Sequence, residues 1–88
     1  MKTVYKYPLE VEDKQILKLP VNSKILSANF QGDDLFFWTL VDKDIDDTEE
    51  FVFYIHGTGH PISEDGYTFI NTVFKHGFVF HIFYKPTN

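Results

Sequence analysis

Short runs of hydrophobic and aromatic residues, separated by Gly, Pro, Asp and Asn, divide the chain into seven segments. In Ile25–Gln31, for example, apolar and polar residues alternate with a period of two, which is typical of a β-strand with one buried face. β-Branched and aromatic residues, which favour an extended backbone, fill the other runs. The predicted strands are Thr3–Tyr7, Asp13–Leu19, Ile25–Gln31, Leu35–Val41, Glu50–His56, Tyr67–Lys75 and Phe78–Lys85.

The same patterns leave little room for helices. No window repeats apolar residues at helical spacing, and Ala28 is the only alanine. The segment Asp42–Glu50 is the one place where an α+β alternative would put a short helix. Gly32-Asp33-Asp34 is typical of a hairpin turn, because Gly and Asp tolerate positive φ. We therefore predict one all-β domain over residues 1–88, a small antiparallel roll, barrel or sandwich of about six to seven strands with little helix.

Three predicted strands are apolar on both faces, namely Leu35–Val41, Phe51–His56 and Phe78–Lys85. A sheet with one face in water should alternate apolar and polar residues. Either the fold covers both faces of these strands, or one face meets a partner or a second copy. Because an 88-residue chain has little material to cover both faces, we expect self-association as a homodimer. The aromatic candidates for a partner contact are Phe36, Trp38, Tyr54 and Phe83.

Aromatic residues make up 18% of the sequence. Such side chains can stack on nucleic-acid bases, but those sites combine them with Lys and Arg. Here the basic residues are 8 lysines spread among 13 acidic residues, so an aromatic core is the preferred explanation. The predicted core residues are Tyr5, Leu17, Leu19, Leu26, Phe30, Phe37, Trp38, Leu40, Phe53, Ile55, Ile70, Phe78, Phe80 and Ile82.

Charge and cysteine content exclude several classes of protein. The chain has no cysteine, which excludes a disulfide scaffold, thiolate zinc sites and thiol catalysis. The formal net charge of −5 argues against nucleic acid as a partner. No apolar run approaches the ~20 residues of a membrane helix, and the charged, alternating N-terminal segment is unlike a signal peptide. We expect a cytoplasmic protein with no membrane partner.

The most distinctive loop is Gly57-Thr58-Gly59-His60-Pro61, which follows a predicted strand directly. Two glycines allow backbone N–H groups to approach a ligand closely, and Thr58 and His60 add polar side chains. A phosphate-binding loop would need a longer glycine spacing, a lysine and a following helix, none of which is present. The alternative is a tight loop that needs glycine for its backbone dihedrals. Gly57, Thr58, Gly59 and His60 are the candidate ligand-binding residues.

The histidines suggest neither a metal site nor catalysis. His56 and His60 flank a glycine loop, whereas zinc needs three or four ligands held in a tetrahedron. His81 lies between core-like Val79 and Phe83 on its strand, which predicts a half-buried, hydrogen-bonded core histidine. No nucleophile has a recognisable base beside it, and no cofactor motif is present. We expect a protein that is not an enzyme and has no metal and no cofactor.

The run Asp42–Glu50 is the most acidic part of the sequence. Its first carboxylates have the one-three-five spacing of a calcium loop, but Asp47 stands where that loop needs glycine and Phe53 where it needs glutamate. The run is therefore either a solvated connection or an attractive surface for a basic partner. Asp44, Asp46 and Asp47 are the candidate acidic residues for partner binding.

Three stretches of the chain resemble a family of small phage and prophage proteins with no established function. They read KTVYKYPL at the N-terminus, GTGHPI after the fifth predicted strand and FVFHIF near the C-terminus. The resemblance implies an accessory protein in a bacterial host cytoplasm, and it brings no catalytic residues. It favours a non-catalytic module that binds a bacterial protein and inhibits a host or defence component. The alternative is a β-domain that binds a small ligand, a nucleotide or signalling molecule, through the glycine loop.

Overall fold

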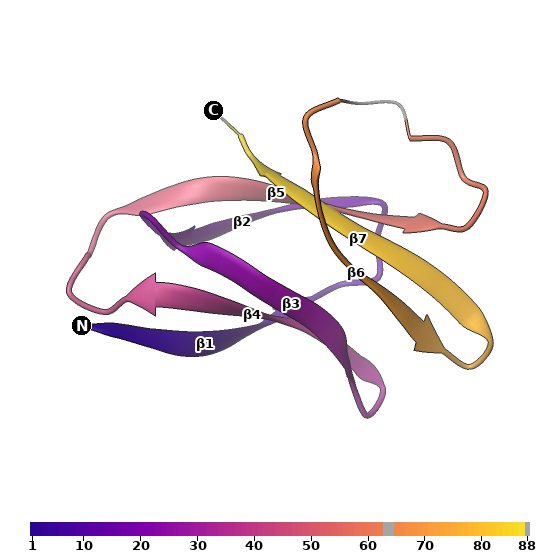
Figure 1. Cartoon of the computed structure of the whole chain (residues 1–88), viewed down its shortest axis with the longest axis horizontal. Coiled ribbons are helices and arrows are strands. Elements are labelled where there is room, and N and C mark those ends of the chain that lie inside the picture. The colour runs from indigo at the N-terminus through magenta and orange to yellow at the C-terminus, as the bar shows by residue number, and fades with distance from the viewer. Residues whose placement is uncertain (63–64, 88) are drawn as a thin grey trace.

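Seven strands and no helix make up the described part of the chain in the computed structural model, which describes residues 1–62 and 65–87 (Figure 1). The predicted all-β class is confirmed, and its architecture is that of two stacked sheets. Each predicted segment forms a strand within a few residues of the expected bounds. The strands are β1 Lys2–Leu9, β2 Lys14–Pro20, β3 Lys24–Gln31, β4 Asp34–Asp42, β5 Thr48–Gly57, β6 Thr68–Lys75 and β7 Phe78–Pro86.

All strand pairs are antiparallel and form two sheets. The three-stranded sheet has the order β1-β4-β3, and the four-stranded sheet has the order β2-β5-β7-β6. The described part measures 40 × 30 × 16 Å, and its shortest dimension suits two sheets packed face to face. Along one side, the edge strands β3 and β6 run next to each other (Figure 1). There the backbone N–H of Ala28 donates to Oδ1 of Asn71 at 3.2 Å, so a side chain links the two sheets.

Two short hairpins are closed by residues that accept positive φ. Gln31 pairs with Asp34, which confirms the predicted turn, and Gly32 at its first central position has a φ of 63°. That is the backbone expected of a type II′ turn. The β6–β7 hairpin turns at His76 and Gly77, with φ of 49° and 83°, as in a type I′ turn. Both turn types match the right-handed twist of the flanking strands, so these local residues set the strand register.

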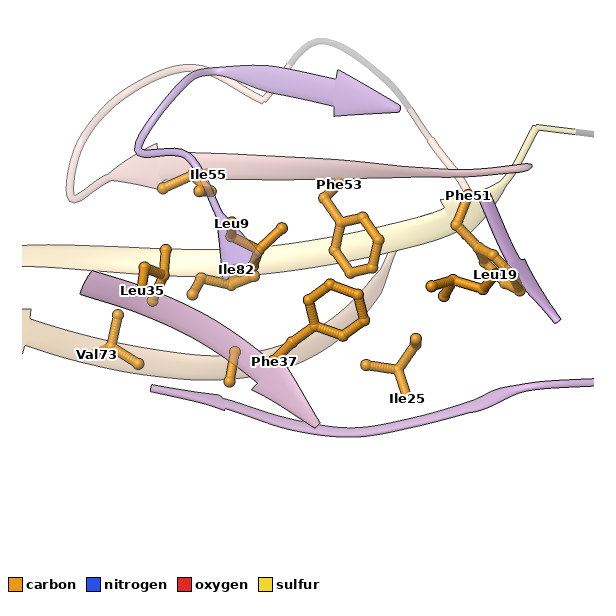
Figure 2. Packing of buried hydrophobic residues seen from close by; sticks show 11 residues of the cluster. Leu9, Leu19, Ile25, Leu35, Phe37, Phe51, Phe53, Ile55, Val73 and Ile82 are labelled. Atoms are coloured by element: carbon orange, nitrogen blue, oxygen red, sulfur yellow. The ribbon is translucent and has the colours of Figure 1, made fainter. Parts of the chain in front are cut away.

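The core lies between the sheets and is centred on two phenylalanines. Phe37 of β4 and Phe53 of β5 are fully buried, and their ring centroids are 4.5 Å apart. Figure 2 shows the two rings facing each other, with aliphatic side chains on both sides. The buried cluster consists of Leu9, Leu19, Ile25, Ala28, Leu35, Phe37, Phe51, Phe53, Ile55, Val73 and Ile82.

The predicted core is partly wrong, because alternation does not say which of two apolar faces points inward. Trp38 and Leu40 are half-buried on the outer face of β4, opposite Phe37. Leu26 is 46% exposed at a β-bulge between Ile25 and Ser27. Tyr5 and Phe78 are also exposed. The predicted residues that are buried or packed against the core are Leu17, Leu19, Phe30, Phe37, Phe53, Ile55, Ile70, Phe80 and Ile82.

β5 is one of the three strands that are apolar on both faces, and the structure shows how both of its faces are covered. Phe51, Phe53 and Ile55 point into the core, while Val52 and Tyr54 alternate with them and are buried on the other side. The fold therefore covers both faces of β5. The segment Asp42–Glu50, where a helix was the alternative, contains a turn and the start of β5.

Charges are segregated along the chain. The lysines lie on strands, with Lys43 as the exception. Within the described residues, acidic side chains are confined to the connections, the two ends of β4 and the beginning of β5. Apart from the ends of β4 and the beginning of β5, the strands carry positive or neutral side chains in a protein whose net charge is −5.

One ion pair joins the two hairpin tips. Lys75 Nζ lies 2.8 Å from Oδ1 of Asp33 and also donates to the carbonyl oxygen of Gly32. His76 Nε2 is 3.8 Å from the same carboxylate oxygen. The hydrogen bond and charge of Lys75, with a smaller contribution from His76, lower the pKa of the Asp33 carboxyl. Asp33 thus ties the β3–β4 hairpin of one sheet to the β6–β7 hairpin of the other.

Replacing Phe37 with Ala should destabilise the fold far more than replacing its neighbour Phe36. Phe37 fills the centre of the core, and such truncations cost about 3–5 kcal/mol. Phe36 points outward and is half-exposed, so Phe36→Ala should cost about 1 kcal/mol or less. Urea unfolding of the two variants measures the difference. A larger loss for Phe36→Ala than for Phe37→Ala would mean that β4 pairs in a register shifted by one residue.

Lys75→Met should raise the pKa of the Asp33 carboxyl towards its ordinary value of 3.8. A lowered folded-state pKa means that the carboxylate stabilises the fold above its unfolded-state pKa. This contribution is lost as the pH falls through the folded-state pKa. An NMR titration of the Asp33 carboxyl in both proteins measures the change, with Lys24→Met as the control. The same midpoint in the parent chain and in Lys75→Met would contradict the ion pair.

Candidate functional site

The outer face of the four-stranded sheet carries a hollow of about 350 Å³, which we call the β5 pocket. Two of its residues come from the start of β2 and the connection before it, and two alternate on β5. The others come from the long connection between β5 and β6. The pocket is lined by Asp13, Lys14, Tyr54, His56, His60, Pro61 and Tyr67.

Three roughly parallel rings lie along this pocket. Tyr67 stacks on Tyr54 with a centroid distance of 3.9 Å and an interplanar angle of 24°. The His56 ring lies 6.2 Å from Tyr54 and 6.3 Å from Tyr67, at interplanar angles of 6° and 18°. Phe83 meets His56 edge-on at 5.9 Å. The connection thus supplies the ring that covers Tyr54, which is only 4% exposed.

Two lysines lie over the tyrosine rings. Lys14 Nζ is 5.9 Å from the centroid of Tyr54, within the range of a cation–π interaction. Lys85 Nζ is 5.9 Å from the Tyr54 centroid and 5.2 Å from that of Tyr67, and it donates to the carbonyl oxygen of Asp65 at 3.4 Å. The ammonium groups of Lys14 and Lys85 therefore border the stacked rings of Tyr54 and Tyr67.

His56 carries a polar atom whose hydrogen bond is missing. Its Nε2 is buried, and no residue in 1–62 or 65–87 provides a hydrogen-bond partner. The cross-strand neighbour His81 is not such a partner, because both of its ring nitrogens bond to threonines. A buried polar group without a partner costs about 1–3 kcal/mol, and such a group in a native structure calls for an explanation.

The two threonines that bond to His81 attach the glycine loop to the sheet. His81 Nε2 is 2.8 Å from Thr58 Oγ1, and its Nδ1 is 2.9 Å from Thr72 Oγ1. The predicted half-buried, hydrogen-bonded histidine is confirmed, but it lies on the outer face of β7 rather than in the core between the sheets. The hydroxyl of Thr58 is thereby engaged within the fold.

The structure explains why glycine occupies both positions of the predicted loop, Gly57 and Gly59. The His60 N–H donates to the carbonyl oxygen of Gly57 at 3.2 Å, and the imidazole lies so close that a Cβ on Gly57 would be 2.9 Å from its Cε1. Gly59 has a φ of 85°, which favours glycine. Of the four predicted ligand-binding residues, only His60 lines the β5 pocket. Gly57, Thr58 and His60 also border a second hollow of about 400 Å³ next to Phe78 and Phe80.

The predicted partner residues fall on two different surfaces. Phe36 and Trp38 lie on the outer face of the three-stranded sheet, whereas Tyr54 and Phe83 lie on the outer face of the four-stranded sheet. They do not form one continuous patch, because the core separates the two faces. The acidic candidates Asp44, Asp46 and Asp47 lie in the β4–β5 connection.

The N-terminal amine is held by the acidic connection. It donates to Oδ1 of Asp42 at 3.2 Å and to a carboxylate oxygen of Asp44. These contacts raise the pKa of the amine, with Asp44 contributing most. The backbone N–H of Asp44 and the amine lower the pKa of Asp42. Asp44 is thus partly neutralised within the chain, and Asp46 and Asp47 are exposed in the same connection.

Sequence reasoning missed Asp13, Lys14 and Tyr67 as pocket residues. Lys14 meets Tyr54 only because β2 pairs with β5, and Tyr67 follows a connection whose path no local pattern reveals. Among residues 1–62 and 65–87, no three His, Asp or Glu side chains lie close enough together to hold a metal ion. No helix long and apolar enough to cross a membrane occurs in that part of the chain.

The whole chain, residues 1–88, matches a protein family described as a domain of unknown function (DUF7352), and it belongs to that family. The expectation of a family without an established function is confirmed to this extent. No curated protein and no solved structure matches the chain.

The effect of Gly57→Ala should depend on His60. With His60 present, the new methyl group collides with the imidazole, an exposed ring that can turn away, so the substitution should destabilise the fold by at most about 1 kcal/mol. In a His60→Ala background the collision is gone, and the loss of glycine flexibility in the unfolded chain should make Gly57→Ala neutral or stabilising. Urea unfolding of the four proteins gives the coupling energy. Additive effects would contradict the close packing of His60 against Gly57.

Proposed function

We propose that this member of the DUF7352 family is a non-catalytic protein-binding module. The observation that carries the proposal is the outer face of the three-stranded sheet. Phe36, Trp38 and Leu40 follow one another along that face of β4, the central strand, and all three remain half-exposed. The strands on either side of a central strand cover part of its side chains. The surface of these three side chains that is still accessible therefore faces outward, away from the core. We call these three residues and Val4, which is 49% exposed, the β4 face.

The pairing register supports an interface on the β4 face. Leu40 lies between Val4 and Lys24, and Trp38 lies between Lys6 and Ser27. Lys6 Nζ is 4.4 Å from the centroid of Phe36, so its stem covers part of the ring while its charge stays at the surface. Aromatic anchors surrounded by polar and charged side chains are the usual anatomy of a protein interface.

The acidic β4–β5 connection continues directly from the end of the β4 face. Asp46 and Asp47 are exposed there. A partner with an apolar surface bordered by basic residues would match both features, and the charge would mainly increase the association rate. Tyr54 and Phe83 contribute less to this proposal, because Tyr67 covers Tyr54 and the ring of Phe83 packs against His56.

The biological setting of the proposal rests on the phage resemblance. A phage-encoded protein of this kind would work in the bacterial cytoplasm, bind a host or defence protein and inhibit it. The β4 face would also serve for a homodimer, so a second copy and a host protein would compete for it. The glycine loop is a weaker basis for function, since Thr58 bonds to His81 and the His60 ring occupies the space over Gly57.

Capture from a bacterial lysate tests the β4 face. The tagged chain should retain a stoichiometric protein partner, and Trp38→Ala should lose it. Phe74→Ala is the matched control, because Phe74 is an exposed aromatic residue, 69% accessible, on β6 of the other sheet. Asp46→Lys with Asp47→Lys should weaken capture mainly at low salt. Capture that survives Trp38→Ala would contradict the proposal.

Light scattering at high micromolar concentration tests the homodimer in the same variants. The parent chain should show about twice its mass of 10.4 kDa, and Trp38→Ala should show a monomer. A monomeric parent would exclude the homodimer and leave the host-protein proposal to the capture experiment.

A further inference from the structure

We infer that the β5 pocket binds a planar, negatively charged heterocycle of the size of a nucleoside monophosphate. The pocket lies on the outer face of the four-stranded sheet, on the far side of the core from the β4 face. The inference therefore does not depend on the proposed protein partner.

The size and walls of the β5 pocket suit a small molecule. Its volume of about 350 Å³ falls within the ~300–1,000 Å³ of typical ligand sites. Such sites combine apolar or aromatic walls with a few well-placed polar groups. Here Tyr54, Tyr67 and Pro61 supply the walls, and His56 and His60 supply the polar groups.

The orphaned nitrogen of His56, a residue that lines the pocket, would be satisfied by a ligand with a hydrogen-bonding edge. A hydrogen bond to an imidazole nitrogen lies in the plane of the ring. That plane is within 6° of the Tyr54 ring and within 18° of the Tyr67 ring. Because Nε2 is covered by neighbouring atoms, a flat ligand would meet it edge-on only after the imidazole or the atoms over it shift, and it would then remain parallel to both tyrosines. Heterocycles such as nucleobases carry such edges.

The charges around the pocket select an anion over a cation. Aromatic rings attract cations, but Lys14 and Lys85 already lie over the faces of Tyr54 and Tyr67. An external cation would meet the ammonium of Lys14 in the pocket wall and that of Lys85 beside Tyr67, whereas a phosphate would be attracted by both. The opposing charge at the pocket is the exposed carboxylate of Asp13, in the connection before Lys14. The balance favours a negatively charged group on the ligand.

Isothermal titration calorimetry with the full chain tests the inference. The probes are AMP, GMP, CMP and UMP, with adenosine and inorganic phosphate as the two halves of the ligand. At least one monophosphate should bind with 1:1 stoichiometry, and adenosine and phosphate should each bind at least tenfold more weakly. A 5′-phosphorylated tetranucleotide distinguishes a free nucleotide from the end of a strand, and tighter binding of the tetranucleotide would overturn the inference.

His56→Phe separates a ligand-binding role from a structural one. The substitution keeps an aromatic ring and removes the nitrogen, so monophosphate binding should weaken at least tenfold. Because Nε2 has no partner among the described residues, the free variant should melt at the same temperature or higher. A lower melting temperature with unchanged binding would show that the nitrogen has a structural partner, and would overturn the inference.

A lysine pair provides the matched control. Lys14→Met should weaken monophosphate binding about tenfold, whereas Lys24→Met, on the other sheet, should leave it within twofold. Trp38→Ala should also bind the monophosphate normally, so failure of the protein-binding proposal and failure of this inference are distinguishable. Absence of binding by all four monophosphates, or equal binding of inorganic phosphate, would overturn the inference.

Discussion

The contact between the tilted rings of Phe37 and Phe53 joins the two sheets at the centre of the core. Phe37 lies on the middle strand of the three-stranded sheet and Phe53 on an interior strand of the other, so their contact at 4.5 Å joins the centres of both layers. The three-stranded sheet is stabilised through the hydrophobic face that it buries against the other sheet. The other buried residues of the cluster, which include Leu9 and Ile82, pack around this pair. The distance between the two sheets therefore depends on the two phenylalanine rings.

The second face of β5 explains the origin of the β5 pocket. Once Phe53 points into the core, its neighbour Tyr54 must point outward. The fold covers Tyr54 with Tyr67, a residue from the β5–β6 connection, instead of with another strand. A connection packs less completely than a strand, so a hollow remains beside the tyrosines. The His56 nitrogen, two residues further along β5, is buried next to that hollow. The pocket is therefore a consequence of building a sandwich with few residues.

The sequence predicted the strands well because their signals are local. Alternation and turn residues such as Gly32 and Gly77 mark where strands begin and end, and two-residue hairpins set the pairing of their neighbours. The choice between Phe37 and Trp38 as the inward residue was not local, since both faces of β4 are apolar. It depends on which other strands stack on the sheet. The pocket could not be predicted from local sequence either. Lys14 reaches Tyr54 because β2 pairs with β5, and Tyr67 reaches it through the long β5–β6 connection.

The distribution of lysines has a consequence for how the protein avoids aggregation. The edge strands are β1 and β3 in one sheet and β2 and β6 in the other, and each carries at least one lysine. An exposed edge offers unpaired backbone groups to any other strand, and a charged side chain there opposes such pairing. Lys2 and Lys6 on β1, and Lys14 and Lys18 on β2, would bring like charges together if two copies joined edge to edge. The lysines on the edge strands thus oppose growth into fibrils, although the outer sheet faces carry exposed apolar side chains.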